Sequence, residues 1–417
     1  MKRIIVAVCA FVAIQNGNAQ VVVDTVITGN GYAENVWYSL ENDEQARSAG
    51  TNWEIALATT IAQSSELSAV IRFNHKIGTL YTVPGALPAD FATLDTAGMV
   101  ANGELQNSDS KWGEGAFSDV TLNGQFDYGW GQYNMTSHNL EANRIFVIKY
   151  ADNTYKKVMI SLNTVGKKYS ITFADLNSAT PTVSEVDYSN ISDRNFVYFS
   201  VKNDQVLNRE PASATWDITF MQYLASVSPT MKYTTFGILT NIGVEAVKVS
   251  GVSDPLTFVD YATQTFSTDM NVIGYNWKDA QAQTVPTDVV YFVKDKNNSI
   301  WKLIFTEFTT GSGTSINQNV FSKEKLVDAL GVDELNANIF LNVYPNPTND
   351  VASIVFDNQA AADVKIVNAL GQVFYQENIQ TTGLQVVNVN VADFQAGIYH
   401  VLVSTDKQIS SQKLIVQ

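Results

Sequence analysis

Arg144-Ile-Phe-Val-Ile-Lys-Tyr-Ala-Asp-Asn-Thr-Tyr-Lys-Lys-Val-Met-Ile160 aligns without a gap with Val289-Val-Tyr-Phe-Val-Lys-Asp-Lys-Asn-Asn-Ser-Ile-Trp-Lys-Leu-Ile-Phe305. Each stretch contains a run of β-branched and aromatic residues, an Asn-containing turn and a second such run. This pattern is typical of a β-hairpin. The sequence therefore indicates a β fold in which one hairpin occurs twice.

A second pair of similar blocks precedes the two hairpins in the same order. Val36-Trp-Tyr-Ser-Leu40 and then Thr51-Asn-Trp-Glu-Ile-Ala-Leu57 are matched by Val197-Tyr-Phe-Ser-Val201 and then Thr215-Trp-Asp-Ile-Thr-Phe220. Because the repeat is far longer than the unit of a solenoid, it predicts two whole domains of one fold. We place them at residues 20–190 and 191–330 and expect the chain to be all-β.

The second set of blocks resembles the HmuY-like haem-binding proteins, through Tyr198-Phe199-Ser200, Trp216-Asp217-Ile218 and the late hairpin that leads to Gly311-Ser312-Gly313. The first set departs from the pattern at Trp53-Glu54-Ile55. The resemblance covers most of residues 33–330. It implies an all-β fold that carries haem between two loops, with two axial side chains that are usually His and in some members Met.

Carried over to this chain, the resemblance points to one loop. His138 lies shortly before the first hairpin, where such a ligand would be placed, and Met135 or Met99 would have to be the second ligand, since a thioether is an accepted axial ligand of haem iron. The ungapped offset places Gln283 opposite His138, which leaves Met270 as the nearby soft ligand in the second half. The same loop also carries Tyr128, Trp130 and Tyr133, which could instead face a sugar or a protein.

The last segment of the chain shows a second resemblance. Leu341-Asn-Val-Tyr-Pro-Asn-Pro-Thr348, Val364 to Val373, Ala396 to Val403 and Gln412 to Gln417 alternate apolar and polar residues between regularly spaced turns, which predicts a small β-sandwich. The four blocks resemble the type A C-terminal sorting domain of the type IX secretion system, which implies handling by its translocon and sortase machinery. The resemblance is carried by Pro345, Asn346, Pro347, Gly371, Gly397, Tyr399 and Lys413.

The beginning of the chain predicts export. Met1-Lys2-Arg3, an apolar run from Ile4 to Ile14 and small residues before Gln20 are typical of a secretory signal peptide at residues 1–19. Cys9, the one cysteine, falls within it, so the mature chain has no thiol. We expect a secreted or cell-surface protein with no transmembrane segment.

Charge and composition exclude further classes. The chain has 26 Lys and Arg against 41 Asp and Glu, a net charge of −15, which disfavours binding to nucleic acid. Of its three histidines, we expect His75 in an early strand and His400 in the terminal sandwich. Between the repeat and the sandwich, Ser322 to Leu330 carries a cap and an apolar stripe that predict a short helix, and residues 331–340 are expected to be a linker.

No enzyme motif was found, and we expect no catalytic activity. The sequence lacks a Gly-x-Ser-x-Gly elbow, a His-Glu-x-x-His pair and a phosphate-binding Gly-rich loop. Three hypotheses follow: a haem or tetrapyrrole binder for haem acquisition, a surface protein that binds a glycan or a protein, and a carbohydrate-active enzyme. The third would use the acidic residues of the first half, Glu104, Glu114, Asp119 and Asp127.

Overall fold

The computed structural model describes residues 21–62, 64–228, 231–310, 316–327, 341–358, 361–368, 372–405 and 409–417. They form 27 strands and four short 3-10 helices, so the predicted all-β class is confirmed. The chain divides into two compact units, residues 1–328 and 329–417. The predicted signal peptide, the predicted linker and the Gly311 turn lie outside the described residues.

The first unit contains two lobes, each built from two sheets. Lobe I has a seven-stranded sheet and a four-stranded sheet. The larger sheet has the order β12-β11-β10-β8-β7; in addition, β9 pairs with β10, and β6 pairs with β9. The smaller sheet has the order β14-β13-β4-β5. Its elements are β4 (Ile55–Ala58), β5 (Ile71–Phe73), β6 (Gly78–Thr82), η2 (Pro88–Thr93), η3 (Ala116–Ser118), β7 (Gly131–Tyr133), β8 (Leu140–Ala142), β9 (Phe146–Tyr150), β10 (Tyr155–Asn163), β11 (Lys168–Asp175), β12 (Thr182–Asp187), β13 (Phe196–Ser200) and β14 (Gln205–Leu207).

Lobe II has a five-stranded sheet, β1-β20-β19-β18-β17, and a four-stranded sheet, β16-β15-β2-β3. Its elements are β1 (Val22–Gly29), η1 (Asn30–Tyr32), β2 (Glu34–Ser39), β3 (Asp43–Ala49), η4 (Ser213–Thr215), β15 (Ile218–Ser228), β16 (Met231–Thr240), β17 (Glu245–Ser250), β18 (Val289–Lys294), β19 (Ile300–Thr310) and β20 (Asn317–Val327). The two predicted hairpins are confirmed as the antiparallel pairs β9–β10 and β18–β19.

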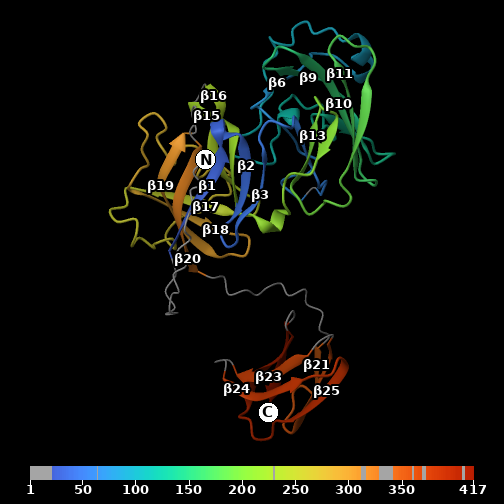
Figure 1. Ribbon diagram of the computed structural model, residues 1–417. Coiled ribbons are helices and arrows are strands. Elements are labelled where there is room, and N and C mark those ends of the chain that lie inside the picture. Colours follow the sequence, from blue (N-terminus) through green and yellow to red (C-terminus); the bar gives the residue numbers. More distant parts are fainter. Residues whose placement is uncertain are drawn as a thin grey trace, which may run out of the picture. The chain divides into compact units, whose positions relative to one another are not determined.

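The two sequence repeats exchange their first hairpins. The β2–β3 hairpin of the first repeat pairs with β15 of the second, with Tyr38 opposite Ile218. In return, β13 of the second repeat pairs with β4 of the first, with Phe199 opposite Ile55. Figure 1 shows β13 in the lobe of β10 and β11, and β2 with β3 in the lobe of β15 and β18. Each predicted domain range, 20–190 and 191–330, therefore contributes strands to the core of the other.

Side chains alternate between the two faces of each exchanged strand, so each four-stranded sheet packs on its own lobe core with one face and on the other lobe with the opposite face. Tyr38 on β2 packs in the core of lobe II, whereas its neighbour Trp37 faces the opposite side. Likewise Phe199 on β13 packs in the core of lobe I, and Tyr198 faces away from it. The outward side chains of the two four-stranded sheets meet in a shared apolar layer, here called the seam, which includes Trp37, Trp53, Trp112, Phe196, Tyr198, Trp216, Tyr223 and Met270.

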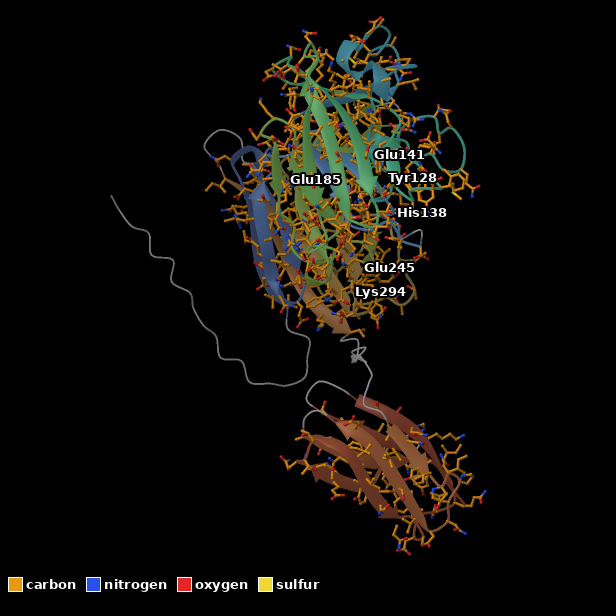
Figure 2. The ribbon with its side chains drawn as sticks, turned by 90° about the vertical axis from the view of Figure 1, so that its right-hand side faces the viewer. Tyr128, His138, Glu141, Glu185, Glu245 and Lys294 are labelled. Carbon is orange, nitrogen blue, oxygen red and sulfur yellow. The ribbon has the colours of Figure 1, made fainter. Side chains whose placement is uncertain are left out.

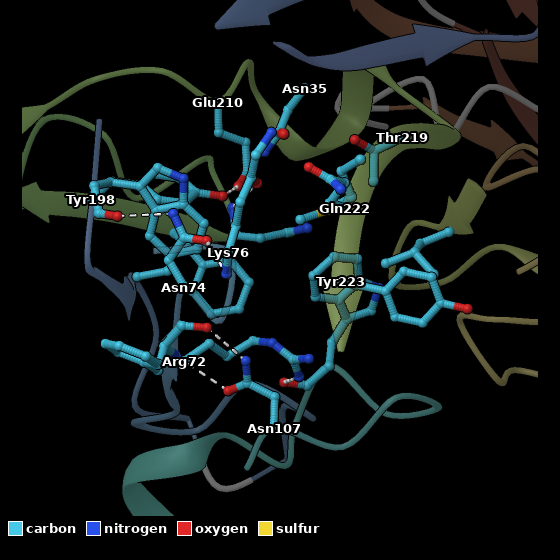
Figure 3. A pocket seen from close by; sticks show the side chains of 18 of the residues that line it. Asn35, Arg72, Asn74, Lys76, Asn107, Tyr198, Glu210, Thr219, Gln222 and Tyr223 are labelled. Atoms are coloured by element: carbon cyan, nitrogen blue, oxygen red, sulfur yellow. Dashed lines mark hydrogen bonds between the residues drawn. The ribbon is translucent and has the colours of Figure 1, made fainter. Parts of the chain in front are cut away.

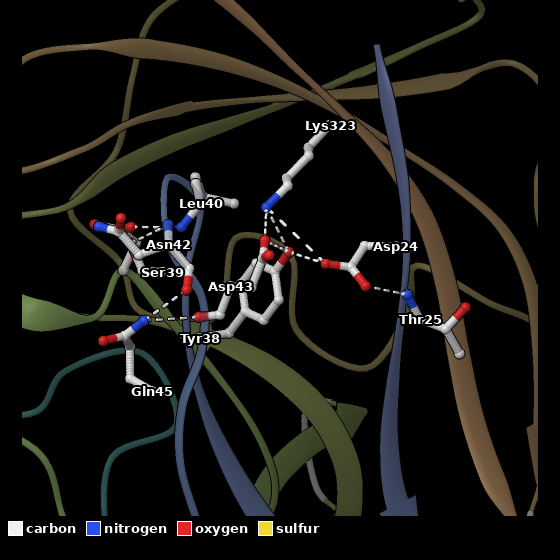
Figure 4. A network of polar contacts seen from close by, with 10 residues as sticks. Asp24, Thr25, Tyr38, Ser39, Leu40, Asn42, Asp43, Gln45 and Lys323 are labelled. Atoms are coloured by element: carbon white, nitrogen blue, oxygen red, sulfur yellow. Dashed lines mark hydrogen bonds and ion pairs between the residues drawn. The ribbon is translucent and has the colours of Figure 1, made fainter. Parts of the chain in front are cut away.

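The predicted helix at 322–330 is wrong for residues 322–327, and residues 328–330 lie outside the described part. Asn317–Val327 is β20, which pairs with both β1 and β19. The local capping signals are overridden because two neighbouring strands satisfy the backbone and bury Phe321 completely. Figure 4 shows how Lys323 of β20 is held: its ammonium donates to the Tyr38 hydroxyl at 2.7 Å and to Asp43, with Asp24 of β1 at 4.0 Å.

The second unit is the predicted β-sandwich. One sheet is β21-β22-β25 and the other is β24-β23-β26-β27, with a shared apolar core between them. The bounds are β21 (Leu341–Tyr344), β22 (Val351–Asn358), β23 (Ala362–Asn368), β24 (Val373–Ile379), β25 (Gly383–Asn390), β26 (Gly397–Ser404) and β27 (Ile409–Val416). Within the described residues of the chain, no helix has the length and apolar character needed to cross a bilayer.

Candidate functional site

The loop that carries His138 is a tight turn between β7 and β8. Asn134 opens it by donating its N–H to the Asn139 carbonyl at 2.9 Å, and its side-chain oxygen accepts the N–H groups of Thr136 and Ser137. An Asn in this position replaces a backbone turn with its own side chain. The turn leaves His138 in the left-handed region, at φ 56°.

The imidazole of His138 is oriented by Tyr133. The Tyr133 hydroxyl lies 2.8 Å from Nδ1 of His138, and the two rings are 6.1 Å apart between centroids. This bond occupies Nδ1, and within the described part of the chain no hydrogen bond to Nε2 is found. In metal-binding histidines the second nitrogen commonly has such a partner, which sets the tautomer and the ring direction.

A cavity of about 360 Å³ opens beside this pair, and we call it the His138 cleft. Figure 2 shows Tyr128, His138 and Glu141 together on one side of lobe I. Most of the lining is apolar or aromatic, and the polar groups come from the turn, from Tyr128 and from Thr164, which follows β10. The lining residues are Ile61, Ala69, Phe126, Tyr128, Tyr133, Met135, His138, Leu140 and Thr164.

The predicted site residues are only partly brought together. Met135 is 62% exposed and lines the His138 cleft with Tyr133 and His138. Met99 is 5% exposed and packs with Tyr81 in a separate cluster, away from the cleft lining. Trp130 is fully buried in the core of lobe I, where its indole N–H donates to the Ala69 carbonyl at 2.9 Å. Trp130 therefore cannot belong to an exposed binding surface.

The other two histidines are placed away from the cleft. His75 was expected in a strand, but it lies in the turn after β5, where its Nε2 accepts the Asn107 N–H at 3.2 Å. Burial, assisted by Arg72 and Lys232, lowers the pKa of His75 to about 3, so the ring is neutral. His400 lies on β26 of the sandwich, opposite Lys413.

Lobe II contains a second turn of the same construction. Asp279 donates its N–H to the Thr284 carbonyl at 2.8 Å, and its side-chain oxygen accepts the N–H groups of Gln281 and Ala282. Gln283, aligned with His138 by the sequence repeat, has φ 55°. A cavity of about 520 Å³ lies beside this turn, and Lys278 occupies the position that Tyr133 has in lobe I.

Met270, expected as a soft ligand in the second half, is instead 1% exposed within the seam. Lys278, which lines the lobe II cavity, was not among the predicted site residues. The ungapped offset that paired Gln283 with His138 would have paired Lys278 with Tyr133, so the signal was present in the alignment.

A third cavity lies within the seam and is small and enclosed, at about 50 Å³ (Figure 3). Arg72 is fixed there by bonds to the carbonyls of Lys111 at 2.7 Å and Ser108 at 2.8 Å. The buried Glu210 accepts the Tyr198 hydroxyl at 2.6 Å. A space of this size holds water rather than an organic ligand. The seam is joined by other bonds: the Trp112 indole N–H donates to the Thr240 carbonyl at 2.8 Å, and the Asn195 amide donates to the Asn241 side-chain oxygen at 2.8 Å.

Three of the four acidic residues predicted for the third hypothesis have separate side-chain partners, whereas Glu114 accepts bonds through its backbone carbonyl from Arg72 and Ser108. Asp127 is buried in an ion pair with Arg144 at 2.7 Å, Asp119 accepts the Gln106 N–H at 2.8 Å, and Glu104 accepts the Tyr81 hydroxyl at 3.2 Å. Burial alone would raise the pKa of Asp127, but Arg144 and three further donors hold it well below its usual range. In the part of the chain that the structure describes, no three His, Cys, Asp or Glu side chains are grouped as metal ligands.

Comparison with known families identifies the second unit. Residues 342–417 match the model of the secretion system C-terminal sorting domain. These residues are a sorting domain of the type IX secretion system. This confirms the predicted route, and the chain is delivered to the outer cell surface or secreted. Residues 33–330, where the sequence resembles the HmuY-like proteins, have no family match.

Within the sorting domain, Asn346 ties the loop after β21 to β27. Its amide donates to the Lys413 carbonyl at 2.6 Å, and its side-chain oxygen accepts the Ile415 N–H at 2.8 Å. The flanking Tyr344-Pro345 and Asn346-Pro347 bonds are cis. Gly397 and Tyr399 lie on β26, and Gly371 lies outside the described residues.

One curated relative is similar over a short stretch. An ulvan lyase of Nonlabens ulvanivorans, NLR42, is 35% identical over 77 residues, which is 18% of this chain. This chain spans 14% of the length of that relative.

Proposed function

We propose that this chain is an exported binding protein without catalytic activity, and that the His138 cleft of lobe I binds a tetrapyrrole such as haem for haem acquisition. The sorting domain accounts for delivery to the cell exterior. The cleft would then be the working part of the mature protein.

The observation that carries this proposal is the Tyr133–His138 pair. The 2.8 Å bond at Nδ1 holds the imidazole of an exposed turn with Nε2 free, which is the arrangement that an axial ligand requires. The thioether of Met135 lines the same cavity. Phe126, Ile61 and Leu140 supply apolar walls for a flat macrocycle. When bound, haem would supply an iron centre that accepts imidazole and thioether ligands.

The proposed absence of catalysis rests on the acidic residues. A glycosidase needs two free carboxyl groups that flank one bond. Asp127 forms a buried ion pair with Arg144. Asp119 accepts a hydrogen bond from the Gln106 N–H, and Glu104 accepts one from the Tyr81 hydroxyl. These contacts favour structural roles for the three carboxylates.

A haem titration of the mature chain from Gln20 tests the proposal. We expect a shifted Soret band in the wild type, its loss in His138→Ala and its retention in His400→Ala, a matched change at an exposed histidine of the sandwich. Tyr133→Phe should keep the band but weaken binding several-fold, because Nδ1 loses its partner. An unchanged haem spectrum with the wild-type chain would eliminate the tetrapyrrole proposal.

A glycan or protein ligand at the same cleft is the second candidate. Phe126, Tyr128 and Tyr133 present rings to the cavity, and Glu141 accepts bonds from Asn134 and Ser137 at its rim. Aromatic faces beside amide and carboxylate groups suit a sugar ring. If this is the function, a Tyr128→Ala, Tyr133→Ala double variant loses glycan or protein binding while the wild type shows no haem band.

A further inference from the structure

The cavity beside the Asp279 turn of lobe II is the counterpart of the His138 cleft, and we call it the lobe II cleft. Its volume of about 520 Å³ lies in the range of small-molecule binding sites. The lining comes from η1, from the β15–β16 hairpin and from the segment between residues 275 and 281. The cleft is therefore assembled from three parts of lobe II that are far apart in the sequence.

The candidate iron ligands of lobe I have no counterparts in the lobe II cleft. The sequence repeat places Gln283 opposite His138 and Ala280 opposite Met135. Among the described residues that line the cleft there is no histidine and no methionine. The duplicated cleft thus lacks the groups that would hold an iron centre, and we expect it to take a different class of ligand.

An aromatic stack forms one wall of the cleft. The rings of Tyr32 and Phe236 are 4.5 Å apart between centroids, with an interplanar angle of 18°. Phe236 is buried and Tyr32 is half-buried, so the stack is fixed in the fold and still reaches the cavity. The ammonium nitrogen of Lys278 is buried among rings, 4.6 Å from the centroids of Phe236 and Phe308 and 4.8 Å from that of Trp277. Lys278 therefore packs behind the lining, and its nitrogen is out of reach of a ligand.

The accessible polar groups of the cleft are mainly hydroxyls and amides. Tyr233 is 50% exposed and Gln281 is exposed, and within the described part of the chain neither side chain has a hydrogen-bond partner. Thr234 and Thr235 add two half-buried hydroxyls. The carboxylate of Asp279 is the accessible charge, and one of its oxygens already accepts two backbone N–H groups of the turn.

We propose that the lobe II cleft binds a neutral saccharide non-covalently. A sugar ring has an apolar C–H face, which packs on an aromatic wall, and a rim of hydroxyls, which pair with amide and hydroxyl groups. The Tyr32–Phe236 stack supplies the wall, and Tyr233 and Gln281 supply the polar partners. Among the described lining residues Lys278 is the one cation, and because it is buried a carboxylated or sulfated sugar finds no counter-ion.

The inference goes beyond the function proposed for the His138 cleft, because it concerns a different cavity and a different class of ligand. A negative haem titration leaves it intact. It is also distinct from a glycan bound in the His138 cleft. The Tyr128→Ala, Tyr133→Ala double variant changes only lobe I and should keep the saccharide binding of lobe II.

Saturation-transfer NMR on the full mature chain tests the proposal. The probes are glucose, galactose, mannose and xylose, with glucuronate as the acidic counterpart. We expect transfer to the ring C–H protons of at least one neutral sugar and weaker transfer to glucuronate. Tyr233→Ala and Gln281→Ala should each raise the apparent Kd about three- to ten-fold, through the loss of one hydrogen bond.

Tyr344→Ala is the matched control, because Tyr344 is 51% exposed and lies on β21 of the sorting domain. It should leave the apparent Kd unchanged, and unchanged urea midpoints of all variants would show that they fold. Four results would overturn the proposal: no transfer to any of the neutral sugars, equal transfer to glucuronate, wild-type affinity in both Tyr233→Ala and Gln281→Ala, or loss of binding in the Tyr128→Ala, Tyr133→Ala double variant.

Discussion

His138 and Gln283 lie at equivalent positions of two duplicated turns and share one left-handed backbone conformation, at φ 56° and 55°. In both turns an Asn or Asp side chain accepts two backbone N–H groups. The backbone of the duplicated loop has therefore been kept while its side chains have changed. Tyr133 orients an imidazole in one lobe, and Lys278 replaces it in the other.

The exchange of hairpins predicts which fragments fold. A fragment of residues 50–207 contains every strand of the lobe I sheets, whereas residues 20–190 lack β13 and β14. We expect the 50–207 fragment to unfold cooperatively in urea and the 20–190 fragment to unfold without a sharp transition. Near-UV circular dichroism and urea titration would measure this. Equal cooperativity of the two fragments would contradict the observed pairing of β13 with β4.

Substitution of Trp130 should mainly lower the stability of the fold, whereas substitution of Tyr133 should mainly impair ligand binding. Trp130→Ala removes a fully buried indole and its bond to Ala69, so it should lower the free energy of unfolding by about 3–5 kcal/mol. Tyr133→Ala, at the edge of the cleft, should cost less than about 1 kcal/mol and should impair ligand binding. Urea denaturation of both variants measures the difference. A Trp130→Ala chain as stable as the wild type would argue against its core position.

Glu210 should make the stability of the seam depend on pH. Burial raises the pKa of Glu210 to about 7, even though Tyr198, Asn195 and Arg209 favour the carboxylate. The folded state therefore holds the proton more tightly than the unfolded state, whose value is near 4.5. The contribution of Glu210 to the free energy of unfolding is therefore full below about pH 4.5. It falls by roughly 3 kcal/mol as the pH rises through 7.

The test compares the urea midpoints of the wild type and Glu210→Gln between pH 4.5 and 8. The difference in urea midpoint between the wild type and Glu210→Gln should change with pH, because the glutamine side chain does not titrate. Glu185→Gln, at an exposed carboxylate of β12, is the matched control and should leave the wild-type slope unchanged. A constant difference between Glu210→Gln and the wild type across this range would refute the assignment.

Asn346 should stabilise the sorting domain through its two backbone bonds to β27. Asn346→Ala removes both, at a cost of about 2 kcal/mol to the unfolding of this domain. Hydrogen exchange at the amides of β27 in the full chain would report the loss as faster exchange. Gln376→Ala, at an exposed position of β24, should leave that exchange as it is.

The hairpins and the sandwich could be predicted because their signals are local. A turn residue between two β-rich runs specifies β9–β10 and β18–β19, and alternation specifies β26. The exchange could not be predicted, since Val36 to Leu40 and Val197 to Val201 are so alike that either block could pair with either Trp-containing strand. Pairing across more than 140 residues leaves no local mark in the sequence.

The errors have similar causes. The helix expected after Phe321 had good local caps, but β1 and β19 offered its backbone better partners. Trp130 follows a glycine on a polar loop and was expected to be exposed, yet it turns inward to Ala69. The Tyr133–His138 contact could have been predicted from the sequence, because the two residues lie on one short turn.

The pairing of β1 with β20 joins the first described strand of the lobes to the last. During synthesis and passage through the inner membrane the N-terminal side emerges first, so β1, β2 and β3 must wait for residues 218–327 before their sheets can form. Lobe I, by contrast, has all its strands once residue 207 has emerged. The chain therefore carries β1, β2 and β3 without the strands that complete their sheets until nearly all of residues 21–327 have emerged, and unpaired strand edges of this kind are prone to aggregate.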